Sequence, residues 1–243
     1  LWIDAICINQ EDLAERADQV KMMSEIFRGC TEVLIWLGEE EGDTDSEMAV
    51  QLVESVYNSF EDFVEDGDSE DATTTFERLE EQIETFDRED GCGEKGYEKF
   101  WHDLAHLQTL WIGKVDLFSL NARCDRRAWA AVGKLTRRSW FRRLWTFQEM
   151  SLGKSAKFLI GENSLPWATL HTVMSLVNMH DNMEGRRRAL VKYEPLRYIQ
   201  SILPVRSTNP YSISLKFTLI DVIRCARPRE CYDPRDKIFG VLG

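Results

Sequence analysis

Two short apolar runs with a helical pattern between them constrain the fold of this chain more than any other feature. Residues 1–8, LWIDAICI, and residues 32–37, EVLIWL, have the length and composition of buried strands. Residues 11–28 place apolar side chains at helical spacing, and Gly29 follows as a stop signal. A strand, a helix and a strand in succession predict a right-handed βαβ unit with parallel strands. We therefore expect an α/β fold in which ligands meet the carboxyl ends of the strands.

The same spacing rules predict elements along the rest of the chain. Residues 156–160 have the composition of a short strand. Helices are expected at residues 46–63, 76–86, 97–110, 166–179, 186–202 and 215–224, with a last one from Asp233-Pro234 to residue 242. The expected core stripe of the first helix consists of Val20, Met23, Ile26 and Phe27. Because no internal repeat or linker is evident, we expect residues 1–243 to form a single domain.

Charge is distributed very unevenly along the chain. Residues 39–98 contain 23 Asp and Glu against 3 Lys and Arg, a net charge of −20, whereas the whole chain carries −12. The remainder is therefore mildly basic, at +8. We interpret residues 39–98 as an acidic helical insertion and predict that residues 65–75 form a mobile, exposed loop. A solvated surface insertion is favoured over an acidic binding tail.

Composition restricts the class of protein. The six Cys show no CxxC pair and no regular spacing, which favours buried free thiols in a reducing compartment over a disulfide framework. No apolar run reaches membrane-spanning length, and the chain does not begin with a basic region followed by an apolar one. We therefore expect a soluble cytoplasmic protein without membrane contact. Because a chain that opens on a buried strand lacks a neighbour for it, we also expect an earlier strand to be missing.

Two other patterns suggest ligands but have simpler explanations. Residues 123–143 contain eight bases and one acid, a density that can meet phosphates. Interleaved Trp and Leu residues favour amphipathic helices with solvated or internally paired bases, so nucleic-acid binding is unlikely. His102 and His106 have a spacing that can bind zinc. Ordinary helical histidines are favoured, because no Glu follows His102 and no third ligand is evident, so no metal is expected.

Residues 139–152, SWFRRLWTFQEMSL, combine the signals of a buried helix with a carboxylate. Trp140, Arg143, Leu144 and Phe147 follow the i, i+3, i+4, i+7 spacing of one helix face, with Glu149 on the adjacent face. A carboxylate in aromatic surroundings is either paired with a cation or poised for chemistry. No Arg of the segment has the spacing to pair with Glu149 within one helix, so its partner is expected to be tertiary.

Two interpretations of Glu149 remain open from the residues alone. In the structural one it forms a buried ion pair with Arg16 or Lys237, while polar residues satisfy one another at a sheet edge. These polar residues are Asp4, Asn9, Gln10, Arg16 and Gln19. In the other it belongs to a ligand site. The same choice applies to the final helix, where four residues form either a cap with surface charges or a ligand-contacting loop, namely Asp233, Arg235, Asp236 and Lys237.

Three blocks of the sequence resemble the fungal heterokaryon incompatibility (HET) domain. They are LWIDAICINQ with the following Glu15, Arg16, Gln19, Val20, Met23 and EVLIWLG, then SWFRRLWTFQE, then DPRDKIFGVLG. The order matches and the resemblance spans the chain. Two departures are the absence of the family's opening strand, roughly ALSY followed by Trp-Gly, and the unusually rich acidic insertion.

The resemblance implies a function. HET proteins act in fungal non-self recognition, in which incompatible partners trigger death of the fused cell, and the HET domain looks like the death effector. The domain is also distantly similar to the Toll/interleukin receptor (TIR) domain, a flavodoxin-like parallel sheet. In that comparison SWFRRLWTFQE matches the TIR stretch that ends in the catalytic Glu of NAD-cleaving enzymes, which places this role on Glu149.

An NAD-cleaving site would need further residues around Glu149. Trp140 or Trp145 could stack on a ring, and Arg143 or Arg16 could hold the pyrophosphate. The expected substrate-binding residues are Asp4, Asn9, Gln10, Arg16, Gln19, Trp140, Arg143 and Trp145. No glycine-rich phosphate loop appears, so NAD is expected as a substrate and not as a Rossmann-bound cofactor. The alternative is a non-enzymatic module that works by self-association and by binding an activating partner.

Overall fold

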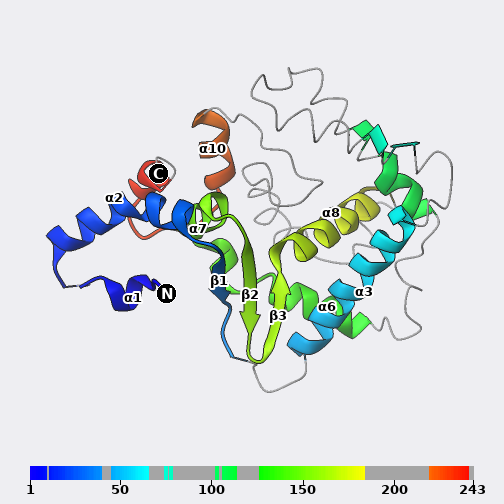
Figure 1. Cartoon of the computed structure of the whole chain (residues 1–243), viewed down its shortest axis with the longest axis horizontal. Helices are drawn as coiled ribbons and strands as arrows, with labels where there is room; N and C mark the ends of the chain where they lie inside the picture. The colour runs from blue at the N-terminus through cyan, green and yellow to red at the C-terminus, as the bar shows by residue number, and fades with distance from the viewer. Residues whose placement is uncertain are drawn as a thin grey trace.

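The computed structural model of this chain is a mixed α/β fold with many helices around a small sheet (Figure 1). It describes residues 1–9, 11–39, 45–65, 74–75, 77–78, 102–103, 106–113, 126–183 and 219–240. The helices, in chain order, are α1 (Asp4–Cys7), α2 (Leu13–Gly29), α3 (Asp45–Glu65), α6 (Arg126–Leu135), the 3-10 helix η1 (Ser139–Arg142), α7 (Thr146–Leu152), α8 (Trp167–Met183), α10 (Leu219–Ala226) and α11 (Asp236–Phe239). The helix expected at 186–202, and most of that at 76–86, lie outside the described residues.

The described sheet has three strands in the order β1-β2-β3. β1 (Val33–Trp36) and β2 (Ala156–Ile160) are parallel, which confirms the strands expected at residues 32–37 and 156–160. β3 (Asn163–Pro166) runs antiparallel to β2, so the sheet is mixed and not parallel throughout. Gly161, at φ 54°, opens the two-residue turn between β2 and β3. Gly161 is the sequence signal for the turn into β3, a strand that the spacing of apolar residues does not predict.

The prediction that residues 1–8 form a buried strand parallel to residues 32–37 is wrong. Residues Asp4–Cys7 form the short helix α1, and Ile8 is the only residue of this run that is buried. A strand needs a backbone partner, and in the described sheet β1 pairs with β2 instead. The Asp4 side chain accepts a hydrogen bond from the Ala5 N–H at 2.7 Å, a local contact that favours a turn.

Cysteine burial also differs from the prediction. Cys7 lies on α1 and is exposed, while Cys30 and Cys231 are partly buried. All three are free thiols, as expected. Cys7 is exposed because residues Asp4–Cys7 form a helix on the surface and not the buried strand that the sequence predicts.

The helix α2 forms where it was expected. Asp12 caps its first turn by accepting hydrogen bonds from the N–H groups of Ala14 and Glu15 at 2.8 and 3.1 Å. Of the expected core stripe, Met23 is buried and Phe27 is partly buried, whereas Val20 is 40% exposed. α2 packs on α7, a helix of only seven residues, which is too short to cover the whole stripe.

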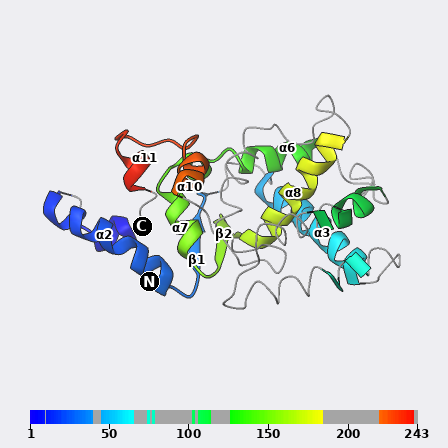
Figure 2. The same cartoon turned by 90° about the horizontal axis from the view of Figure 1, so that it is seen from above.

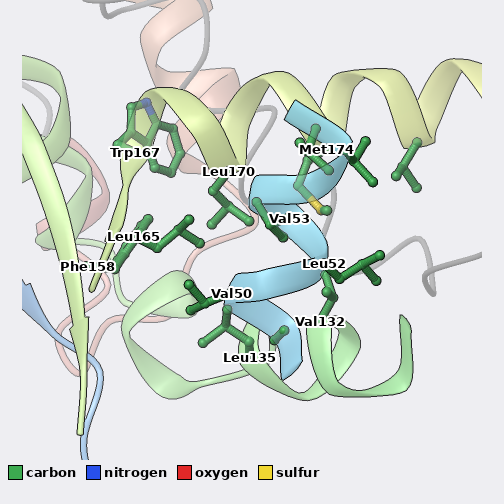
Figure 3. Packing of buried hydrophobic residues seen from close by; sticks show 14 of the residues in the cluster. Val50, Leu52, Val53, Val132, Leu135, Phe158, Leu165, Trp167, Leu170 and Met174 are labelled. Atoms are coloured by element: carbon green, nitrogen blue, oxygen red, sulfur yellow. The ribbon is translucent and has the colours of Figure 1, made fainter. Parts of the chain in front are cut away.

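The apolar core of the described residues lies between the inner face of the sheet and the helices α3, α6 and α8 (Figure 3), and it extends to buried side chains of the segment 140–150, such as Trp140 and Met150. Val53 and Phe60 of α3 are buried there against α6 and α8. The helix expected at residues 46–63 is thus confirmed, and it is a core helix although it lies within the acidic stretch. Its acids lie outside the apolar stripe, which is why net charge did not prevent burial. The loop expected at residues 65–75 is almost wholly outside the described residues.

Basic residues around α6 pair within the molecule, as the amphipathic interpretation predicted. Lys134 forms an ion pair with Asp45 at the start of α3. Arg138 donates from Nη1 to the carbonyl of Leu37 at 2.8 Å and to that of Gly38 at 3.2 Å. These contacts join the end of β1 to the segment that follows α6.

A second group of elements lies on the other side of the molecule. Figures 1 and 2 show α2, α7 and α11 gathered there, away from α3 and α8, with the N-terminus close by. In the part of the chain that the structure describes, no helix is both long and apolar enough to cross a membrane. This second group carries the candidate site.

Candidate functional site

The segment that carries Glu149 is not the single helix that its spacing predicted. The 3-10 helix η1 ends at Arg142, Arg143 is extended at φ −69° and ψ 139°, and α7 begins at Thr146. The break is held by backbone pairing with a distant segment. The Leu144 N–H donates to the Glu230 carbonyl at 2.8 Å, and the Glu230 N–H donates to the Arg142 carbonyl at 2.6 Å. A helix cannot continue through residues whose backbone groups pair in this way.

Thr146 stabilises the break from within. Its buried hydroxyl lies 3.0 Å from the Trp140 carbonyl and 2.7 Å from the Arg143 carbonyl, so it shares its proton between them. The Trp140 carbonyl belongs to η1 and the Arg143 carbonyl to the turn between η1 and α7. The hydroxyl therefore fixes the direction in which α7 leaves η1.

The Glu149 carboxylate is held by an indole. Trp140 Nε1 donates a hydrogen bond to Glu149 Oε2 at 3.1 Å, and the Glu149 side chain is partly buried. The buried Trp140 ring packs edge-on against Phe141 and Phe158, with ring centroids 5.3 and 5.4 Å apart. The indole is thus locked in the core, where it orients the carboxylate.

The environment of Glu149 disfavours its charged form. Burial raises the pKa of the Glu149 carboxyl above its usual range, and the charge of Asp4 raises it further. The hydrogen bond from Trp140 and the charges of Arg143 and Arg229 act in the opposite direction without cancelling the rise. The structure therefore brings two expected site residues, Asp4 and Arg143, within electrostatic range of Glu149.

The ion pair between Glu149 and Arg16 or Lys237, which the structural interpretation of Glu149 requires, is not formed in the described part of the chain. Lys237 Nζ donates to the Arg227 carbonyl at 3.2 Å and to the Arg229 carbonyl. Arg16 is exposed on α2. Lys237 reaches these carbonyls because α11 packs close to the segment that follows α10, a tertiary arrangement that sequence spacing does not reveal. Glu149 is thus a partly buried carboxylate with an indole donor and without an ion-pair partner among the described residues.

Several other expected site residues have local roles instead. The Asn9 N–H donates to Glu15 Oε1 at 3.1 Å, and its Oδ1 accepts from the Glu11 N–H at 3.1 Å, so Asn9 shapes the turn before α2. Gln19 is partly buried on α2, and Gln10 lies outside the described residues. This polar network lies at a helix start and not at a sheet edge, because residues 1–8 do not form a strand.

The final charged cluster also makes internal contacts. Trp145 Nε1 donates to Asp236 Oδ2 at 3.3 Å, so the Trp145 indole is directed to α11 and not to Glu149. Asp233 accepts from the Arg235 N–H at 2.9 Å and from its guanidinium, which holds the pKa of Asp233 at about 2. These contacts match the cap-and-surface-charge interpretation. The last helix is shorter than expected, ending at Phe239, and residues 241–243 are outside the described set.

Sequence reasoning missed one residue of this region, Arg229. Its side chain is 1% exposed, and its Nη1 donates to the Phe141 carbonyl at 3.1 Å and to Thr146 Oγ1 at 3.3 Å. No spacing distinguishes it from Arg224 and Arg227, which lie nearby on the same segment and are exposed. Burial of a guanidinium depends on acceptors supplied by other elements, so no local pattern could have identified it.

The Glu149 carboxylate can stabilise positive charge that develops beside it, because a desolvated carboxylate acts strongly at short range. Arg143, which is exposed, can contact an anionic part of the same ligand. The described residues contain no cluster of three or more His, Cys, Asp or Glu side chains that could hold a metal ion.

Comparison with known proteins places the chain in a family. The sequence model of the heterokaryon incompatibility protein (HET) family matches residues 1–149, from the first residue to Glu149 itself. The chain belongs to the HET family. Heterokaryon incompatibility protein 6, OR allele, of Neurospora crassa is 30% identical over 256 aligned positions, which cover 100% of this chain and 34% of that protein. No solved structure matches.

The residues matched by the HET family model do not include every residue of the candidate site. The matched residues supply Asp4, Trp140, Arg143 and Glu149. Arg229, which donates hydrogen bonds to the turn between η1 and α7, lies outside the matched residues, in the segment between α10 and α11. The site of this HET chain is therefore built from the matched region and from a later segment that packs onto it (Figure 2).

Proposed function

We propose that this HET chain is a death-inducing effector domain of fungal heterokaryon incompatibility that cleaves the bond between nicotinamide and ribose in NAD, with Glu149 as the reacting carboxylate. Family membership and the printed name of the Neurospora crassa relative support the role in incompatibility. One observation supports the chemistry: Glu149 is partly buried and oriented by Trp140 Nε1 at 3.1 Å without an ion-pair partner among the described residues. We also propose that the domain is distantly related to the TIR domain and its flavodoxin-like sheet.

The proposed reaction suits a single carboxylate. The electron pair of the bond between ribose C1′ and the nicotinamide nitrogen leaves with the ring, so the cationic nicotinamide departs neutral and needs no strong acid. The ribose becomes oxocarbenium-like, and ionised Glu149 stabilises or captures it. Water then completes the reaction, yielding ADP-ribose, nicotinamide and one proton. The charge on the substrate changes beside Glu149, where the low dielectric makes a fixed negative charge most effective.

The raised pKa of Glu149 favours a cationic ligand. In the free protein, burial penalises the negative charge, so bringing a positive nicotinamide close relieves part of that penalty. Asp4 adds negative charge to the same area, and its carboxylate can accept hydrogen bonds from ribose hydroxyls. Arg143 is exposed beside Glu149 and can bind the pyrophosphate bidentately.

The test is the Glu149→Gln substitution in the full-length protein, with NAD loss and nicotinamide release measured together. We expect turnover to fall by orders of magnitude, since the amide keeps the Trp140 hydrogen bond but lacks the negative charge. Glu25→Gln, at an exposed position of α2, is the matched control and should keep full turnover. Assembled wild-type protein that kills cells yet consumes no NAD would end the proposal.

The stability of the same variant separates the catalytic role from a structural ion pair. A folded-state pKa above the unfolded value means that Glu149 contributes stability below its unfolded pKa and loses that contribution as pH rises through the folded pKa. Glu149→Gln should therefore match or exceed the wild type in thermal unfolding above neutral pH. A loss of about 3 to 5 kcal/mol would instead indicate a broken buried ion pair.

A second function is favoured by a different surface. Leu34 and Trp36, at alternate positions on the outer face of β1, are 49% and 52% exposed, which is high for two large apolar side chains on one strand face. Non-enzymatic assembly with a second copy of the chain would cover them. Trp36→Lys should then abolish self-association, measured by light scattering. An unchanged oligomeric state would exclude this surface.

A further inference from the structure

We propose that Arg229 is a positioning residue for Glu149, acting from outside the HET match: its buried guanidinium fixes the turn between η1 and α7 and thereby aims the Glu149 carboxylate. The inference rests on the proposed role of Glu149 in NAD cleavage. It adds a component from the segment between α10 and α11, which neither the family match nor the residue spacing identified.

The contacts of Arg229 converge on a single turn. Nη1 donates to the Phe141 carbonyl at 3.1 Å, to Thr146 Oγ1 at 3.3 Å and to the Arg143 carbonyl at 3.4 Å. Its Cζ lies 5.6 Å from the centroid of the Phe147 ring, a cation–π contact at the start of α7. All four groups lie between residues 141 and 147, so one side chain ties the end of η1 to the first turn of α7.

A short chain of contacts carries this constraint to the carboxylate. Arg229 holds the Thr146 hydroxyl, and that hydroxyl holds the carbonyl of Trp140 at 3.0 Å. The indole of the same Trp140 donates to Glu149 Oε2 at 3.1 Å. Glu149 is also on α7, three residues after Thr146. The two ends of the Trp140–Glu149 hydrogen bond are therefore both fixed relative to Arg229.

The segment that carries Arg229 is itself anchored on both sides. Glu230 pairs through its backbone with residues 142 and 144, and its carboxylate lies 3.4 Å from Arg142 Nη1. The carbonyl of Arg229 accepts from Lys237, and Asp236 accepts from Trp145. Arg229 thus enters the turn from a backbone that is held in place, as a positioning residue requires.

Arg229 also acts on Glu149 through its charge. The charge of its guanidinium lowers the pKa of Glu149. The other charged groups that act on Glu149 among the described residues are Arg143, which also lowers this pKa, and Asp4 of α1, which raises it. α2 packs on α7 but adds no charged side chain to this set in the described part of the chain.

The experiment compares Arg229→Met, which removes both charge and hydrogen bonds, with Arg229→Lys, which keeps the charge. Arg227→Met, at an exposed position on the same segment, is the matched control. The readouts are NAD turnover against pH and the titration of the Glu149 carboxyl by carbon NMR, assigned with Glu149→Gln. Full-length protein is used throughout.

We expect Arg229→Met to move the Glu149 titration to higher pH and to lower kcat by about a hundredfold with little change in KM, since the carboxylate is misplaced and less often ionised. Arg229→Lys should keep the wild-type titration and recover part of kcat, because an ammonium restores the charge but not the forked hydrogen bonds. Arg227→Met should behave as wild type.

Each outcome decides a separate claim. A folded Arg229→Met protein with an unchanged Glu149 titration and unchanged kcat would overturn the positioning role. If Arg229→Met does not fold, Arg229→Lys decides, and a wild-type kcat in that variant would overturn it. If the wild type cleaves no NAD, the proposed function fails, while the titration shift in Arg229→Met still tests whether Arg229 acts on Glu149.

Discussion

The two sides of the molecule, one around α3, α6 and α8 and the other around α7, are held together by different contacts. Between the sheet and the helices α3, α6 and α8, buried apolar side chains such as Val53, Phe60 and Phe158 dominate. Around α7, side chains bond to the backbone of distant segments, as Arg229 and Thr146 do. Apolar packing tolerates small shifts in the direction of a side chain, whereas hydrogen bonds lose strength steeply with angle. The polar side is therefore the one suited to hold a reacting carboxylate in a fixed orientation.

The largest expected effect lies in the apolar core. Phe60 is 1% exposed, and its ring meets Trp111 edge-on with centroids 5.7 Å apart. Phe60→Ala should lower the free energy of unfolding by about 3 to 5 kcal/mol in urea denaturation, through lost burial and the cavity left behind. Leu34→Ala, at a half-exposed position, should lower it by less than about 1 kcal/mol. Equal effects of the two changes would show that α3 is not a core helix.

On the polar side we expect a smaller loss, but one with a functional consequence. Thr146→Val should lower the free energy of unfolding by about 1 to 3 kcal/mol, because it removes a donor to two carbonyls and an acceptor for the buried Arg229. Thr136→Val is the matched control in the apolar region. The Thr136 hydroxyl also lies near two carbonyls, those of Val132 at 3.0 Å and Gly133 at 3.3 Å, and the Val132 carbonyl accepts from the Thr136 N–H as well. What distinguishes Thr146 is that it also accepts from the buried Arg229. A larger loss for Thr136→Val would contradict the contrast between the two sides.

Acid should weaken the apolar side through His171. Burial lowers the pKa of His171 to about 3, and its ring stacks on Trp167 with centroids 6.0 Å apart. A neutral folded histidine contributes stability above its unfolded pKa and loses it as pH falls towards the folded value. We expect wild-type stability to fall by about 1 kcal/mol between neutral pH and pH 5.5 from this group. His171→Phe should flatten that limb of the unfolding curve, and an unchanged limb would assign it to other residues.

The smallest effect is expected at an exposed ion pair on the polar side. The Arg235 guanidinium beside Asp233 holds the pKa of that carboxyl at about 2. The contribution of Asp233 is present above the usual carboxyl pKa and is lost as pH falls towards 2. Because the pair is exposed and screened by water and salt, Asp233→Asn should change the melting temperature only slightly at neutral pH. A large change would mean that this turn contributes to the rigidity of α11.

Local sequence determined much of the scaffold. The periodicity of apolar side chains predicted β1, β2, α2, α3 and α8, because each of these elements buries one face and its spacing records which one. The same residues carried the resemblance to the HET family, which the comparisons confirm. Sequence also singled out Glu149, since a carboxylate among aromatic side chains is conspicuous without any coordinates.

Tertiary structure decided what local pattern leaves open. Residues 1–8 have the composition of a strand, but without a paired neighbour in the described sheet residues Asp4–Cys7 form the short helix α1. Residues 139–152 have the spacing of one helix, yet backbone pairing with Glu230 divides them. Arg229 is buried because acceptors on a distant turn solvate its charge. In each case the deciding partner is a backbone group or side chain far away in sequence, and hydrogen bonds to such partners leave no period in the local sequence from which they could be predicted.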